Sequence, residues 1–127
     1  MTESESTRRL CEELEQCGCL VKPHVASMMN QPGWPDRWVC HRLWHGHLEM
    51  KAGDGELSPL QRRRLSEIER RQPGTAFVLR FVRDEEGRPV MQVERSDGHR
   101  YGSVESARHL MESLAGIRDR LLAEEGS

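Results

Sequence analysis

The sequence is poor in several features that define common classes of protein. Its 127 residues contain no apolar run near the roughly 20 residues that a membrane-spanning helix requires. Residues 1–9 are polar and lack the apolar centre of a signal peptide, so we expect a cytoplasmic protein. The formal net charge is −2, which excludes a strong overall attraction to polyanions. Any contact with nucleic acid must therefore come from a local basic cluster.

The chain has four cysteines, and three of them fall close together in its N-terminal part. The four are Cys11, Cys17, Cys19 and Cys40. In a cytoplasmic protein they are expected to be reduced thiols rather than disulfides. A zinc site built from Cys17, Cys19 and His24 is an alternative, but it lacks a second ligand pair at the spacing of structural zinc sites. His41, His45 and His47 alternate as on a surface hairpin, and we assign them no metal.

The order of predicted elements indicates an α/β fold. In chain order we expect a helix ending at Gly18, strands over residues 19–25, 36–43 and 44–51, a helix opened by Ser58-Pro59-Leu60-Gln61, strands over residues 75–82 and 89–95, and a helix over residues 103–124. The two strands before residue 52 are expected to join near His45-Gly46, although Gly46 also fits a bulge. These elements predict one domain, residues 1–127, with a mixed central sheet flanked by helices.

Two short motifs carry ionisable side chains at informative spacing. Asp36 opens one predicted strand, and Glu49 and Lys51 lie two apart on the next, so both project from the same face. A hairpin can bring Asp36 alongside Glu49. Two carboxylates at one sheet edge repel each other unless a cation lies between them, and Mg²⁺ or Mn²⁺ suits such oxygen ligands. Lys51 would then stand where it can orient or help deprotonate a water that attacks phosphorus.

The same residues also have a purely structural interpretation. Pro-Asp commonly opens turns, and Glu-x-Lys is a common pair on an exposed strand face. Neither motif alone specifies a nuclease, and the wider segment decides between the two interpretations.

Residues 33–79 resemble the VRR-NUC branch of the PD-(D/E)XK nucleases. In that family a G-x-P-D-R segment leads to an E-x-K strand, a glycine-containing turn, an S-x-x-Q helix start and a final apolar strand. The matching segments here are Gly33-Trp34-Pro35-Asp36-Arg37, Glu49-Met50-Lys51, Ser58-Pro59-Leu60-Gln61 and residues 75–79. The resemblance implies a restriction-endonuclease-like fold and a metal-dependent phosphodiesterase.

The resemblance also assigns roles to individual residues. It implies that Asp36, Glu49 and the Met50 carbonyl hold Mg²⁺ or Mn²⁺ and that Lys51 is the catalytic lysine. Gln61 would be an accessory residue, a role compatible with its position in a capping box. The family also supplies a glutamate from the first helix. Four compete for that position, of which we favour Glu5 and then Glu12; the others are Glu3 and Glu13.

Arginines dominate the helix that follows the E-x-K strand. Arg62, Arg63 and Arg70 could bind phosphates beside the cut, or they could be a solvated face paired with Glu67 and Glu69. The two interpretations are equally compatible with the sequence.

Residues 83–127 lie beyond the resemblance and are expected to add a hairpin and a C-terminal helix. Their apolar stripe permits core packing or a homodimer seam.

The sequence thus predicts an endonuclease that cuts DNA, branched or otherwise structured DNA included, in a phage or mobile-element setting. Two readings compete with it: a non-catalytic nucleic-acid-binding or assembly module that retains the fold, and a zinc-stabilised adaptor.

Overall fold

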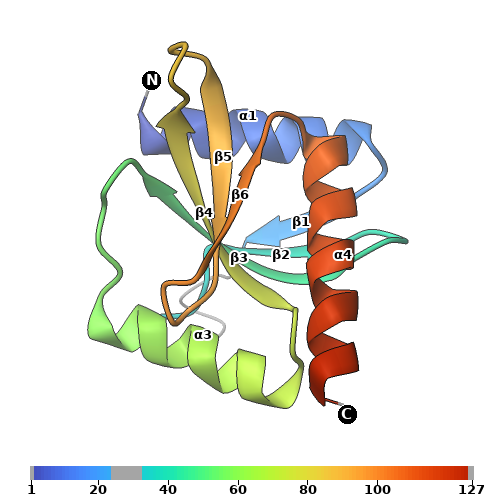
Figure 1. The fold of residues 1–127 in the computed structure, drawn as a ribbon. Helices are drawn as coiled ribbons and strands as arrows, with labels where there is room; N and C mark the ends of the chain where they lie inside the picture. The colour runs from blue at the N-terminus through green and yellow to red at the C-terminus, as the bar shows by residue number, and fades with distance from the viewer. Residues whose placement is uncertain (1, 24–32, 126–127) are drawn as a thin grey trace.

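A six-stranded mixed sheet forms the centre of the protein. The computed structural model describes residues 2–23 and 33–125, and its strands lie side by side in chain order (Figure 1). They are β1 (Leu20–Pro23), β2 (Arg37–Cys40), β3 (His45–Ala52), β4 (Ala76–Arg83), β5 (Pro89–Glu94) and β6 (Arg100–Val104). All neighbours are antiparallel except β3 and β4, which are parallel. The α/β fold with a mixed sheet is therefore confirmed.

Three helices are described around this sheet: α1 (Glu3–Gln16), α3 (Pro59–Arg71) and α4 (Ala107–Glu125). Helix α3 begins as the sequence predicts, with Ser58 and Gln61 in a capping box and Pro59 at its first position. It connects β3 to β4, because parallel strands need a crossover. None of the described helices is long and apolar enough to cross a membrane.

The two faces of the sheet are covered by different helices. Along β4, Phe77 and Leu79 belong to the larger core with α1 and α4, whereas Ala76 and Val78 belong to a smaller core with Leu65 of α3. This alternation is the period of two expected of a strand buried on both faces. Figure 1 shows α3 apart from α1 and α4, with the sheet between them.

The boundary of the last helix differs from the prediction. Residues Arg100–Val104 form β6, and α4 begins only at Ala107 rather than at Ser103. Val104 is 3% exposed and pairs with Met91, so it belongs to the sheet. The strand was missed because it is short, mostly polar and contains a glycine. Residues 83–125 thus complete the sheet and place Leu110, Met111 and Leu114 in the main core.

The connection between β2 and β3 also lies elsewhere than predicted. The turn spans residues 41–44, closed by a hydrogen bond from the His41 N–H to the Trp44 carbonyl (2.9 Å), and Gly46 lies inside β3. A Cβ atom at Gly46 would lie 2.3 Å from the Thr75 carbonyl oxygen and 2.5 Å from the Trp44 ring. Glycine is needed here for a close approach between backbone and ring, not for a turn.

Candidate active site

Strand β3 places Glu49 and Lys51 on the face of the sheet that α3 covers. Their partners on β4 are Val78 and Arg80, and Val78 packs against α3. Glu49 is 2% exposed, and its Oε2 lies 3.9 Å from the Lys51 Nζ. The shared face that the E-x-K spacing predicts is therefore present, but the pair is largely buried and is not a surface pair.

Asp36 reaches the same place from the residue before β2. Because Arg37 pairs with Leu48 across the antiparallel β2–β3 ladder, Asp36 comes to the level of Glu49 and Met50. Its Oδ2 accepts a hydrogen bond from the Met50 N–H at 2.9 Å. This bond fixes the Asp36 carboxylate beside β3, as the predicted hairpin requires.

Gln61 combines the two roles that the sequence leaves open. Its Oε1 accepts from the Ser58 N–H at 2.9 Å, which completes the capping box of α3. Its Nε2 donates to the Glu49 Oε2 at 3.2 Å. Helix α3 therefore holds the Glu49 carboxylate through the same side chain that caps its own first turn.

The Glu49 carboxyl is in a strongly perturbed electrostatic environment. Burial raises its pKa from 4.5 to about 8, the nearby Asp36 carboxylate adds to the rise, and Lys51 opposes it. Its Oε1 is buried and has no hydrogen-bond partner among the described residues. Burying a carboxylate oxygen without a hydrogen-bond partner costs free energy, so we expect this atom to bind a ligand.

The residues present fit a hard divalent cation. The unpartnered Glu49 Oε1 and the Asp36 carboxylate are oxygen donors of the kind that Mg²⁺ and Mn²⁺ prefer. Met50 lies between Glu49 and Lys51 with its side chain fully buried in the core, so only its backbone carbonyl could contribute. Within residues 2–23 and 33–125, no three His, Cys, Asp or Glu side chains are grouped as a metal site. Protein ligands would therefore be few, as is usual for Mg²⁺, which retains several waters.

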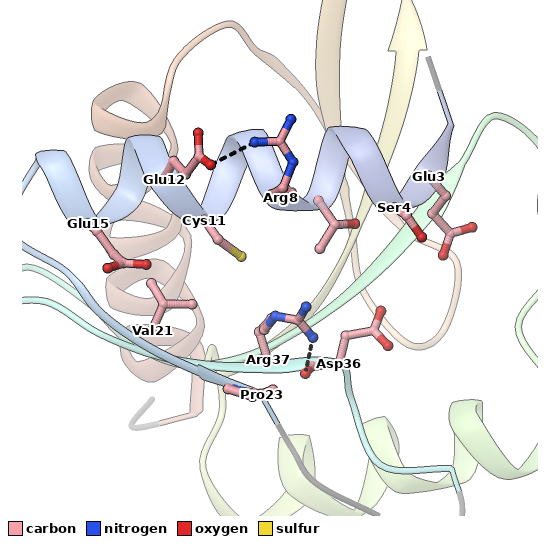
Figure 2. Close-up of a pocket in the computed structure, with 11 residues that line it drawn as sticks. Glu3, Ser4, Arg8, Cys11, Glu12, Glu15, Val21, Pro23, Asp36 and Arg37 are labelled. Carbon is pink, nitrogen blue, oxygen red and sulfur yellow. Dashed lines mark hydrogen bonds and ion pairs between the residues drawn. The ribbon is translucent and has the colours of Figure 1, made fainter.

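A cavity of about 440 Å³ lies between α1 and the first two strands, and Asp36 is part of its wall (Figure 2). Glu3 lines it from the start of α1. Figure 2 shows Glu3 at the same end of the cavity as Asp36. Of the three glutamates of α1 that line the cavity, Glu3 is thus the one at the end where Asp36 lies.

Glu5, the glutamate favoured from the sequence, is not brought to this cavity. Its Oε2 accepts from the Thr2 N–H at 3.1 Å in the capping box of α1. The second choice, Glu12, lines the cavity but pairs with Arg8 at 2.7 Å. The helical period could have distinguished Glu3 from Glu5 and Glu12. Glu3 lies seven residues before the buried Leu10 and therefore lies on the same face of the helix as Leu10.

The arginines of α3 are mostly engaged within the protein. Arg62 donates to the Ser96 carbonyl oxygen, and Arg63 and Arg64 both pair with Glu67, at 3.3 Å and 3.2 Å. Arg64 also lies over the Trp34 ring, 5.4 Å from its centroid. The predicted pairing with Glu67 is therefore present, whereas Glu69 instead accepts from the Gly74 N–H. Phosphate binding by Arg62, Arg63 and Arg70 stays a prediction.

Among the residues of the zinc alternative, Cys17 makes a hydrogen bond within its own helix end. All four cysteines are free thiols, and Cys17 donates from Sγ to the Glu13 carbonyl. His41 Nε2 lies 3.1 Å from the Cys17 carbonyl oxygen, and His24 lies outside the described residues.

Comparison with known proteins identifies the fold. No family model matches the chain, and no curated protein is similar to it in sequence. Among solved structures, it is similar to Hjc, a Holliday junction resolvase from the archaeal hyperthermophile Archaeoglobus fulgidus, with a TM-score of 0.57 and 17% identity. The similarity covers 90% of this chain and 98% of Hjc, so it extends far beyond residues 33–79. The chain therefore has the fold of Hjc, which is the restriction-endonuclease-like fold expected from the sequence.

Proposed function

We propose that this protein is a metal-dependent endonuclease of the PD-(D/E)XK class that hydrolyses phosphodiester bonds in DNA. One observation carries the proposal: Asp36, Lys51 and Gln61 lie around the buried Glu49 carboxylate, one oxygen of which has no hydrogen-bond partner among the described residues. A Glu49–Lys51 salt bridge on the surface would not require Asp36 and Gln61 to lie beside it. A buried carboxyl whose pKa is strongly raised, beside a lysine, is typical of functional sites.

Each residue of the site has a distinct role in the proposed reaction. Asp36 and Glu49 would hold Mg²⁺ or Mn²⁺, with the Met50 carbonyl as a further ligand. The bound ion supplies charge stabilisation on the phosphate and a lower pKa for water. Lys51 lies beside Glu49, where its ammonium would donate a hydrogen bond to the attacking water and orient it. Gln61 fixes the orientation of the Glu49 carboxylate.

Glu3 is our candidate for the carboxylate that the family supplies from its first helix, in place of Glu5. Its position in the wall of the cavity that contains Asp36 supports this choice. Glu3→Gln should lower cleavage, whereas Glu5→Gln should chiefly weaken the cap of α1. Equal loss of turnover in both variants would contradict the choice of Glu3.

Branched DNA is the substrate that we favour. The support is the resolvase activity named for Hjc, together with a fold similarity that spans nearly all of both chains. The finer VRR-NUC assignment rests on the order of the motifs between Gly33 and Leu79. It is compatible with this substrate.

The test is a cleavage assay on plasmid, single-stranded and four-way-junction DNA, with EDTA, Mg²⁺, Mn²⁺ or Ca²⁺. We expect cutting of the junction in Mg²⁺ or Mn²⁺ and none in EDTA. Binding without cutting in every metal would instead favour a non-catalytic module that retains the fold.

A further inference from the structure

A buried ion pair lies beside the candidate site, on the strand next to Lys51. Arg80 and Glu94 are 7% and 3% exposed, and Arg80 Nε lies 2.7 Å from Glu94 Oε2. Arg80 is the partner of Lys51 in the parallel β3–β4 ladder, so the two side chains leave adjacent strands on the same face. The pair is therefore a neighbour of the site, although neither residue belongs to the motifs found in the sequence.

The Arg80 guanidinium also holds the turn that follows Lys51. Its Nη1 donates to the carbonyl oxygens of Gly53 (3.1 Å) and Gly55 (2.6 Å). The Gly53 N–H in turn donates to the Phe81 carbonyl at 3.0 Å, so the turn is bonded to β4. Gly55 lies against the Lys51 side chain, because a Cβ built on Gly55 would be 3.7 Å from the Lys51 Cδ.

Stability alone is a weak explanation for this arrangement. Taking two charges out of water costs about as much as their attraction returns, and apolar residues of similar volume often replace such pairs without loss. A planar guanidinium can bond a carboxylate and two carbonyls at once, which no apolar residue can do. The pair thus serves to define the geometry of the turn.

We propose that Arg80 is a positioning residue: held by Glu94, its guanidinium fixes the Gly53–Gly55 turn and thereby keeps the Lys51 ammonium beside Glu49. This inference rests on the proposed function and names a residue outside the family's motifs. Arg80 touches no reacting atom and acts through Lys51.

Two variants separate positioning from stability. Arg80→Lys keeps the charge but cannot reach Glu94 and both carbonyls. Arg80→Met/Glu94→Met removes both charges and keeps the volume, so it should fold. We expect kcat on junction DNA in Mg²⁺ to fall about tenfold or more in both, because misplacement of a catalytic group lowers turnover. KM and the affinity for Mg²⁺ should stay within about threefold. Arg83→Lys, an exposed arginine on the same strand that donates to Gly87, is the matched control.

A thermodynamic cycle with Lys51→Ala tests whether Arg80 acts through the lysine. If it does, Lys51→Ala should lower kcat much less in the Arg80→Met/Glu94→Met background than in the wild-type protein. The reason is that substitutions at residues that act together do not have additive effects. Equal factors in the two backgrounds, or a wild-type kcat in the folded double variant, would overturn the proposal.

Hydrogen exchange gives an answer that does not depend on cleavage. The Gly53 amide should be protected in the wild-type protein and in Arg83→Lys, and should exchange at least about tenfold faster in Arg80→Lys. Unchanged protection would overturn the role of Arg80 even if the wild-type protein cuts no DNA. Absence of cutting with the expected exchange pattern would count against the nuclease proposal alone.

Discussion

The buried Glu49 carboxyl should make the metal-free protein lose stability as the pH rises. Its pKa is about 8 in the folded protein against 4.5 for the free side chain, because of burial and the neighbouring Asp36. Between these values the folded state binds more protons than the unfolded state. The contribution of protonated Glu49 to the free energy of unfolding is therefore fully present below pH 4.5, declines above pH 4.5, and is lost above pH 8.

The size of the effect follows from the same two values. One pKa unit corresponds to about 1.4 kcal/mol, so the full shift is worth at most about 5 kcal/mol. Between pH 5 and pH 7 the loss should be about 2 to 3 kcal/mol. This is a large fraction of the stability of a small domain.

Glu49→Gln isolates this contribution. The amide is neutral at every pH, and its carbonyl oxygen can still accept the hydrogen bond from Gln61. We expect the variant to be more stable than the wild-type protein at pH 7 in EDTA, and to lack most of the decline with pH. Urea unfolding at several pH values measures both quantities. Glu56→Gln, which removes an exposed carboxylate from the loop before α3, is the matched control.

Added Mg²⁺ tests the metal site in the same experiment. A cation that binds the ionised carboxylates stabilises the folded state, so wild-type protein should recover stability at pH 7 to 8 and Glu49→Gln should recover little. Parallel pH profiles for the wild-type protein and Glu49→Gln in EDTA would refute the reasoning, because the buried carboxyl would then titrate as it does in the unfolded chain.

The remaining predictions concern other residues. Lys51→Ala and Lys51→Arg should both lower kcat by about a hundredfold while junction binding in Ca²⁺ persists in a gel-shift assay, and a wild-type rate in either would remove Lys51 from the mechanism. Gly46→Ala should lower the free energy of unfolding by about 2 kcal/mol or more because its Cβ would overlap the Thr75 carbonyl and the Trp44 ring. Gly116→Ala, on an open helix face, should raise it by about 0.5 to 1 kcal/mol in the same denaturation assay. A variant lacking all four cysteines should still cut DNA, and stoichiometric zinc in the native protein with loss of fold on chelation would contradict this.

The parts of the site that the sequence predicts are those governed by local geometry. The period of two places Glu49 and Lys51 on one face, and an antiparallel partner brings Asp36 to the same level. Capping chemistry places Gln61 at the first turn of α3. Each of these depends on a few neighbouring residues, so a single sequence contains enough information.

The parts that were missed depend on contacts across the fold. Arg80 interrupts the apolar run of residues 76–82, and nothing local indicates that its charge pairs with Glu94 on the next strand. Strand β6 is short and polar, and it is stabilised by pairing with β5 and by the buried Val104. For the glutamates of α1, the helical period of Leu10 and Leu14 separates the face that includes Glu3 from the face that includes Glu5.

The topology explains why these residues meet where they do. Strands β3 and β4 are parallel, so the chain must leave the end of β3 at Ala52, run back along α3, and enter β4 from the opposite end. The first turn of α3 therefore lies near the end of β3, which places Gln61 against Glu49. The same parallel register sets Arg80 beside Lys51 and within reach of the turn that leaves β3. One crossover connection thus places Gln61 beside Glu49 and Arg80 beside Lys51, at the same end of the two parallel strands.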